Sequence, residues 1–255
     1  NGTWQFNLSH TPDVRPFYFF KDDFETKDWK TITVPGNWEL QGFDVPIYVN
    51  VQYPYKPTPP LPPKDYNPVG SYKRTFAIPE EWKGQDIILH FGAVSSAMYV
   101  WVNEQQVGYS EDSKTPAEFN ITKYLKKGEN SLAVEIYRWC DGSYLEDQDF
   151  WRMSGITRDV FLMARNPQHI SDFRVSSPLI NNYKDGEFKL AVEVVNSASN
   201  TTSLTLEAVL MDGETKVAEM NQADKQQLSR LLLIWLQMFR QQNRGLPKIP
   251  TCINY

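Results

Sequence analysis

GSYKRTFAIPEEWKGQDIILHFGAVSSAMYVWVN, residues 70–103, decides the fold class. It contains three short runs, 71–78, 86–92 and 97–103, in which apolar residues alternate with polar ones or follow one another. Pro, Gly and Asn separate the runs, as they separate β-strands in proteins. Short strands at this spacing predict an antiparallel β-sandwich.

The same pattern continues on both sides of this stretch. TITVP (31–35) precedes it, and SLAVEIYRW (131–139) and RDVFLMA (158–164) follow. A second block begins near Asn166 and has the period of a small immunoglobulin-like sandwich, with turn signals NNYKDG and DGE. Its strand-like runs are HISDFRVSSPLI (169–180), EFKLAVEVVNS (187–197), TSLTLEAVLMD (202–212) and TKVAEM (215–220).

The character of the sequence changes after Met220. Apolar side chains then recur with the spacing of one helix face, which predicts an amphipathic helix. A single helix after two β-domains is unusual. The residues on this face are Leu228, Leu231, Leu232, Trp235, Met238 and Phe239.

Composition excludes several classes of protein. The chain has 255 residues, 41% of them hydrophobic, which is enough for packed cores in one large or two ordinary domains. Lys and Arg number 26 against 31 Asp and Glu, and no basic block could neutralise a run of phosphates. No run approaches the roughly 20 apolar residues that span a bilayer. Cys140 and Cys252 form neither a disulfide framework nor a zinc-binding pattern. We therefore expect no nucleic-acid and no membrane partner.

The stretch QYPYKPTPPLPPKDYNPVG, residues 52–70, is rich in proline. Proline removes backbone donors and fixes φ, so we expect an irregular, extended surface segment. Such a segment can be a polyproline ligand for a partner. A rigid loop packed on its own domain is the favoured interpretation.

Polar and aromatic residues concentrate in RWCDGSYLEDQDFWR, residues 138–152. Four carboxylates within it can accept hydrogen bonds from sugar hydroxyls, hold a cation or act in acid–base chemistry. They can equally be structural, paired with Arg138, Arg152 or backbone amides. Asn50, on a short extended piece among aromatics, offers an amide donor and acceptor. Aromatics make up 14% of the chain, and their rings suit both sugar stacking and core packing, with core packing favoured for any one ring.

Several of these stretches together resemble glycoside hydrolase family 2, and in particular its large bacterial β-galactosidases. The resemblance runs in the family's order over residues 1 to about 175. The matching stretches are NGTWQF, VPGNWELQGFDVPIYVNVQYPY, GSYKRTF, GYSEDSKTPAEFNIT, GENSLAVEIYRW, DGSYLEDQDFWRMSGITRDV and ISDFRV.

The resemblance implies an all-β fold with a jelly-roll sugar-binding sandwich over 1–165 and an incomplete immunoglobulin-like sandwich over 166–226. In the family an (α/β)8 barrel with two catalytic glutamates follows. We therefore expect the N-terminal part of a retaining β-galactosidase, without catalytic residues and inactive alone. A stand-alone carbohydrate-binding module is the alternative, and a structural interaction domain is a third.

The resemblance also implies site residues. Asn50 looks like the amide that contacts galactose hydroxyls, and Asp149 like a carboxylate that touches the sugar and ligates sodium in a partial site. Asp141, Glu146 and Asp147 then become structural, held by the two arginines. We expect no cofactor in this chain, sodium and magnesium in a full-length enzyme, a galactoside substrate and a homo-oligomer. The compartment, bacterial cytoplasm or periplasm, stays open.

The tail, residues 227–255, departs from the family. The family's second domain ends in Trp-Ser/Thr-Ala-Glu-x-Pro-x-Leu-Tyr, which is missing here. The motif can be recovered in another reading frame. If suitable synonymous codons are chosen for RGLPKIPTCINY (244–255), and each new codon combines the third base of one codon with the first two bases of the next, the translation is Trp-Thr-Ala-Glu-Asn-Pro-Asn-Leu-Tyr-Gln-Leu. We therefore expect a frameshift between about Lys225 and Leu233 and no family structure beyond it. The coding DNA tests this expectation.

Overall fold

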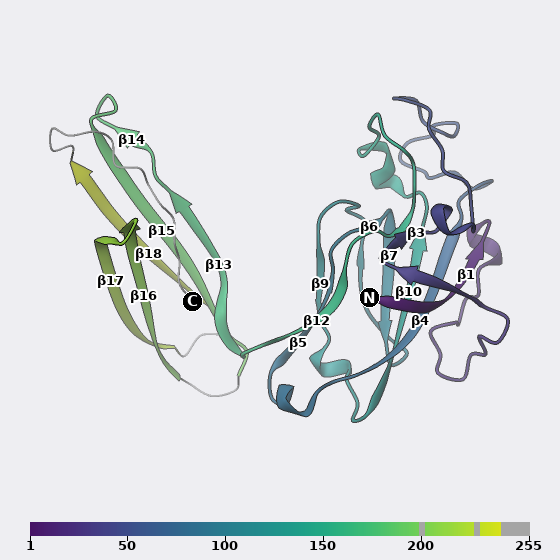
Figure 1. Ribbon diagram of the computed structural model, residues 1–255, viewed down its shortest axis with the longest axis horizontal. Coiled ribbons are helices and arrows are strands. Elements are labelled where there is room, and N and C mark those ends of the chain that lie inside the picture. The colour runs from purple at the N-terminus through teal and green to yellow at the C-terminus, as the bar shows by residue number, and fades with distance from the viewer. Residues whose placement is uncertain (199–201, 227–229, 241–255) are drawn as a thin grey trace. The chain divides into compact units, whose positions relative to one another are not determined.

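The computed structural model describes residues 1–198, 202–226 and 230–240 (Figure 1). The chain divides into two compact units, Asn1–Ala164 and Arg165–Tyr255, and both are built of antiparallel β-structure. The described part of the chain contains no helix long and apolar enough to cross a membrane. Its helical elements are short 3-10 turns at Pro12–Val14, Glu39–Gln41, Glu80–Trp82, Thr122–Tyr124 and Asp141–Tyr144.

The first unit is a sandwich of one large and two small sheets. The six-stranded sheet has the order β2-β1-β4-β10-β7-β8. Its strands are β1 (Gly2–Ser9), β2 (Lys30–Val34), β4 (Val69–Ala77), β7 (Ala97–Val102), β8 (Gln105–Ser110) and β10 (Glu129–Tyr137). The small sheets are β3 (Gly36–Asn37), β11 (Gly155–Ile156) and β6 (Val94–Ser95), and β12 (Val160–Arg165), β5 (Asp86–Phe91) and β9 (Ala117–Asn120).

The alternation of the strands explains the core of this unit. In β10, Val134 and Ile136 are fully buried in the core between the sheets, because successive side chains of a strand point to opposite faces. Gly70 of β4 lies so close to Trp38 that an added Cβ would sit 2.6 Å from its ring. The buried core is large and aromatic, and it includes Trp4, Phe6, Ile32, Trp38, Tyr72, Phe91 and Val100.

The opposite face of the large sheet is also covered. Residues 10–29, which contain no strand, include Phe19, whose ring lies 5.8 Å from that of Trp101 and is fully buried. Arg15 of the same segment forms an ion pair of 3.2 Å with Glu135. Burial raises the pKa of the Glu135 carboxyl, although Tyr137 and Arg15 act in the opposite direction.

The second unit contains a four-stranded sheet and a hairpin. In the sheet, β15 (Asp185–Asn196) pairs with β13 (Gln168–Ser176), β14 (Leu179–Ile180) and β18 (Arg230–Arg240). The hairpin joins β16 (Thr202–Asp212) to β17 (Thr215–Gln226). The buried core of the second unit consists of Phe188, Leu190, Val192, Val194, Leu210 and Trp235.

The sequence predicted the fold class and most strands correctly. The six strands predicted before residue 165 are present, each with ends within two residues of those predicted. Residues 52–68 of the proline-rich stretch are irregular as expected, and the bridge between Thr58 and Leu61 is the one strand-type pairing described within them. The last two residues of the stretch, Val69 and Gly70, begin β4. The tyrosines of the stretch pack on the same unit, since the ring of Tyr55 lies 5.1 Å from that of Trp139.

The predicted helix over residues 228–239 was wrong. Residues 230–240 form β18, which pairs with β15 over its whole length. Trp235 is buried against Phe188, whereas its neighbour Ile234 is 54% exposed. A continuous apolar run satisfies a period of two as well as a helical period. The sequence motif at residues 244–255, on which the predicted frameshift rests, lies outside the described residues.

Candidate functional site

Two segments far apart in sequence lie side by side at one edge of the first unit. A β-bridge joins Ile47 to Arg152, with the Arg152 N–H 2.7 Å from the Ile47 carbonyl and the Ile47 N–H 3.4 Å from the Arg152 carbonyl. The rings of Tyr48 and Trp151 lie 5.5 Å apart. We call residues 44–50 and 147–152 together the rim.

The rim carries both residues that the resemblance singled out. The two segments run antiparallel, so Asn50, three residues after Ile47, and Asp149, three residues before Arg152, leave the bridge in the same direction. Both are exposed. Asn50 has φ of 55°, a left-handed conformation that asparagine tolerates better than most residues. The Tyr48 hydroxyl donates a hydrogen bond of 2.8 Å to Asp149, and this bond, with the carboxylate charge, raises the pKa of Tyr48.

Arg152 ends the second rim segment, and its side chain is almost entirely buried. Its Nη2 donates to the Asn50 carbonyl at 3.1 Å and to the Asp147 carboxylate. Its Nη1 donates to the carbonyls of Gln148 and Phe150, the two neighbours of Asp149. One guanidinium therefore contacts backbone from both segments.

Arg138 is the second buried arginine, with a fully buried side chain. Its Nη2 donates to the carbonyls of Val45 at 3.1 Å and Arg152 at 3.0 Å. Its charge is balanced by Asp44, to which Nη1 donates, and by Glu39 at 3.6 Å. Buried charge needs such pairing to be tolerated in a core.

The acids around Arg138 are held by further hydrogen bonds. The Ser154 N–H donates to both carboxylate oxygens of Glu39, at 3.0 and 2.9 Å. Burial raises the pKa of the Glu39 carboxyl, and the Ser154 bond and Arg138 oppose this only in part. The Tyr66 hydroxyl donates to Asp44, and burial together with this bond raises the pKa of Tyr66 to about 12.

The expectation about the acidic stretch was right for one arginine and wrong for the other. Asp147 pairs with Arg152 as expected. Glu146 instead accepts hydrogen bonds from the backbone N–H and the hydroxyl of Ser113. Arg138 pairs instead with Glu39 and Asp44, which lie outside the acidic stretch. No spacing in the sequence links acids almost a hundred residues away to this arginine.

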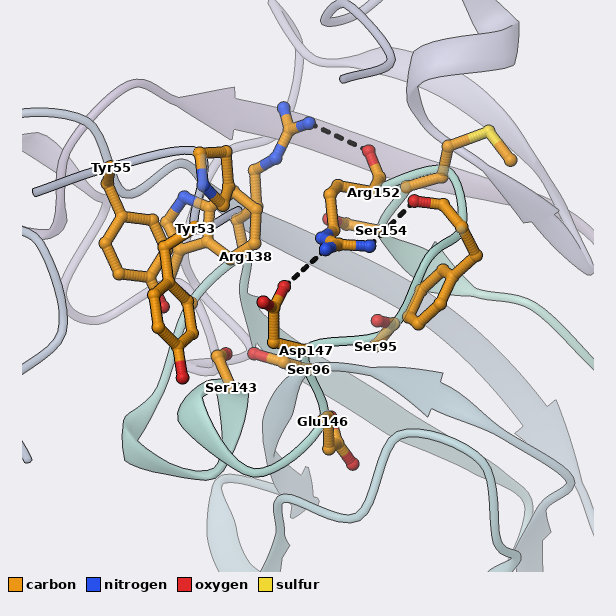
Figure 2. Close-up of a pocket in the computed structure, with 14 residues that line it drawn as sticks. Tyr53, Tyr55, Ser95, Ser96, Arg138, Ser143, Glu146, Asp147, Arg152 and Ser154 are labelled. Atoms are coloured by element: carbon orange, nitrogen blue, oxygen red, sulfur yellow. Dashed lines mark hydrogen bonds and ion pairs between the residues drawn. The ribbon is translucent and has the colours of Figure 1, made fainter. Parts of the chain in front are cut away.

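A small cavity lies below the rim (Figure 2). Figure 2 shows the Arg152 guanidinium reaching the Asp147 carboxylate, and Arg138 donating to the backbone of Arg152. The cavity volume is about 40 Å³. Since a buried water needs roughly 10–15 Å³ on this measure, the cavity has room for water molecules and not for a hexose.

A second, larger groove of about 440 Å³ lies elsewhere on the first unit. Its lining includes Tyr99, Tyr109, Tyr137 and Trp139. A groove of this size with aromatic walls has the dimensions of small-molecule sites. The Tyr109 hydroxyl donates to Glu111 at 2.6 Å.

Metal-ligand geometry among the described residues occurs at Glu111, Cys140 and Asp141, whose potential ligand atoms lie within 4.8 Å of one another. No local sequence pattern indicates this group, because Glu111 lies far from the other two residues in sequence. Asp149 is not part of it. An exposed carboxylate is a suitable ligand for a hard cation, and Asp149 supplies one such group.

Comparisons with known proteins agree with this architecture. The family model described as "Glycosyl hydrolases family 2, sugar binding domain" matches residues 1–167. A β-galactosidase of Priestia megaterium is 50% identical over 221 residues, covering 85% of this chain and 21% of that protein. A β-galactosidase of Pectobacterium atrosepticum is 44% identical over 225 residues, covering 88% of this chain and 21% of that protein.

Solved structures show the same fold. A β-glucuronidase of Bacteroides uniformis superposes with a TM-score of 0.73 at 22% identity, covering 94% of this chain and 27% of that one. The chain spans about a fifth of the length of the curated relatives it matches. Because the family's sugar-binding model matches 167 of the 255 residues, the chain belongs to the family 2 glycosyl hydrolases.

Proposed function

We propose that this chain is the galactose-binding, N-terminal part of a β-galactosidase that hydrolyses terminal non-reducing β-D-galactose residues with retention of configuration. The observation that carries the proposal is the Ile47–Arg152 bridge, which holds Asn50 and Asp149 at one rim. The β-galactosidases that match over 85% and 88% of the chain support the choice of galactosides.

The rim offers the groups that bind a hexose. The amide of Asn50 can donate to one hydroxyl and accept from another, and the Asp149 carboxylate accepts from hydroxyls. Trp151 is 53% exposed, and its ring can pack against the apolar face of a sugar. A sodium ion would take Asp149 as one ligand and draw its other ligands from the rest of the enzyme.

The described residues of the rim support binding rather than cleavage. Retaining glycosidases place two carboxyl groups about 5–5.5 Å apart, one as nucleophile and one as acid and base. At the rim Asp147 is bound to Arg152, and nearby Glu146 is bound to Ser113. Asp149 is left as one exposed carboxylate. Bond cleavage is therefore assigned to a separate catalytic domain.

The test uses a chimaera in which residues 1–167 of this chain replace the aligned segment of the Priestia megaterium β-galactosidase. Asn50→Ala and Asp149→Asn should each raise KM for a β-galactoside about tenfold. The first removes an amide that binds a hydroxyl, and the second replaces a charged acceptor by a neutral amide. Asp65→Asn, at an exposed acid outside the rim, is the matched control. Unchanged KM in both rim variants contradicts the proposal.

The aromatic groove favours the alternative of a stand-alone carbohydrate-binding module, and titration of the whole chain with galactose separates the two. An N-terminal part of an enzyme should bind galactose weakly or not at all, because its site is incomplete. Tight binding that survives Asn50→Ala and Asp149→Asn and is lost in Tyr109→Ala places the sugar in the groove. That outcome contradicts the galactosidase proposal.

A further inference from the structure

We propose that Arg138 and Arg152 are positioning residues of the sugar site: together, as an arginine clamp, they fix the spacing of the two rim segments and hence the placement of Asn50 and Asp149. The identity of the ligand rests on the proposed function. The role of the two arginines in fixing the rim backbone rests on geometry alone. The identity of the ligand and this positioning role are tested separately.

Arg152 holds the outer part of the rim. It donates to the carbonyl of Asn50 itself and to the carbonyls on either side of Asp149. The guanidinium is planar and rigid, so its donors keep fixed relative directions. Three carbonyls bound to one such group cannot shift independently of one another. A lysine ammonium, a single point with three donors, cannot reproduce this spread.

Arg138 holds the inner part. Its Nη2 joins the Val45 carbonyl, at the start of one segment, to the Arg152 carbonyl, at the end of the other. The acids Glu39 and Asp44 hold the guanidinium in place. The backbone of Arg152 is thus fixed by Arg138, and the side chain of Arg152 then fixes the rest of the rim.

The clamp is needed because the rim has little other backbone order. Within the described residues, the Ile47–Arg152 bridge is the one strand-type pairing between the two segments. Asn50 has a positive φ, a conformation that asparagine tolerates but that is less favourable than ordinary extended or helical backbone. Its carbonyl is the atom that Arg152 binds, so the arginine stabilises the turn that presents the Asn50 amide.

The first test uses the whole chain and needs no sugar. In Arg152→Lys, amide hydrogen exchange within 45–52 and 146–151 should become about tenfold faster, the change that loss of one hydrogen bond from a charged donor produces. Exchange in β4 and β10 should stay unchanged. Arg74→Lys is the matched control, because Arg74 also donates to a backbone carbonyl, that of Asn1, outside the rim. Unchanged exchange at the rim in Arg152→Lys overturns the clamp, and so does a uniform increase over the whole first unit.

The second test uses the chimaera and separates positioning from folding. KM does not depend on the fraction of enzyme that is folded, whereas apparent kcat does. Arg152→Lys should raise KM about tenfold, as loss of a residue that orients a ligand-binding group does, with little change in kcat. A fall in apparent kcat at unchanged KM indicates a merely structural role and overturns the positioning role.

A double-mutant cycle completes the test. If Arg152 acts through Asn50, Arg152→Lys should raise KM much less in an Asn50→Ala background, because coupled residues are not additive. Full additivity of the two changes overturns the inference. If Asn50→Ala and Asp149→Asn both leave KM unchanged while rim exchange still responds to Arg152→Lys, the galactoside proposal fails and the role of the two arginines in fixing the rim backbone stands.

Discussion

Tyr48 donates its hydroxyl to the carboxylate of Asp149, across the bridge that joins the two rim segments. The carboxylate disfavours a phenolate beside it, so the pKa of Tyr48 is raised above the usual tyrosine value. A measured pKa of Tyr48 therefore tests whether the Tyr48 hydroxyl and the Asp149 carboxylate are in contact.

Asp149→Asn should therefore lower the pKa of Tyr48, because the variant removes the negative charge. NMR titration of the chain labelled at the tyrosine ring carbons measures this, with Tyr48→Phe to assign the signal. Asp65→Asn should leave the Tyr48 titration unchanged. A pKa of Tyr48 that does not respond to Asp149→Asn would show that the two side chains are not in contact.

Gly70→Ala should destabilise the first unit by about 1–3 kcal/mol, the usual cost of overpacking a core. A Cβ at this position would meet Trp38 at 2.6 Å and Phe6 at 2.9 Å. Urea unfolding followed by tryptophan fluorescence measures the loss. Ser71→Ala on the same strand is the control, since the Ser71 hydroxyl is buried without a hydrogen-bond partner among the described residues. Equal stability of the two variants would contradict the packing.

Glu39 makes stability depend on pH. Burial raises its pKa in the folded state, so the folded chain binds this proton more tightly than the unfolded chain does. Its contribution to stability is then fully present below the unfolded pKa and falls as pH rises through the folded pKa.

Glu39→Gln removes this titration. The stability of the variant relative to the parent should rise as the pH rises above the ordinary glutamate pKa of 4.5, because the folded-state pKa of Glu39 lies higher than that value. Urea unfolding at several pH values measures it, and Glu80→Gln at an exposed turn is the control. A difference that falls or stays flat with pH would mean that Glu39 ionises as readily in the folded chain as in the unfolded one.

Trp235→Ala should destabilise the second unit by about 3–5 kcal/mol, the usual cost of deleting a buried aromatic side chain. Hydrogen exchange within β15 should accelerate, because the Trp235 ring packs 5.3 Å from that of Phe188 on that strand. Ile234→Ala, at the exposed neighbour, should change stability by no more than about 0.5 kcal/mol. Equal effects of the two substitutions would contradict the pairing of β18 with β15.

The sequence predicted those strands that follow from the alternation of apolar and polar residues and from the Pro, Gly and Asn residues that separate the runs. Val134 and Ile136 of β10 stand two residues apart, and this spacing of apolar side chains indicates a strand with one face in the core. Glu135 between them is also buried, on the other face, where it pairs with Arg15, and the pattern does not reveal this. The run around Trp235 carries apolar residues at almost every position, so two periods fit it, and the partner strand β15 decides between them.

The site was less predictable for a physical reason. Asn50 and Asp149 were selected by family resemblance, and the function of both remains a prediction. The pairing of Arg138 with Glu39 and Asp44 depends on contacts across some ninety residues of chain, and no local pattern reports such contacts. Tyr48 could have been singled out as an aromatic two residues before Asn50, yet its bond to Asp149 follows from the fold.

The two arginine side chains donate hydrogen bonds to main-chain carbonyls, which are those of Val45, Asn50, Gln148, Phe150 and Arg152. Position 50, with φ of 55°, favours asparagine or glycine. Every amino acid carries a carbonyl, so side chains at positions such as 49, 148 and 151 can be exchanged without removing any atom the guanidinium groups need. The backbone geometry of the rim is therefore maintained independently of the side chains that would select a sugar. An engineer who seeks a different sugar preference can randomise those positions while Arg138 and Arg152 are left unaltered.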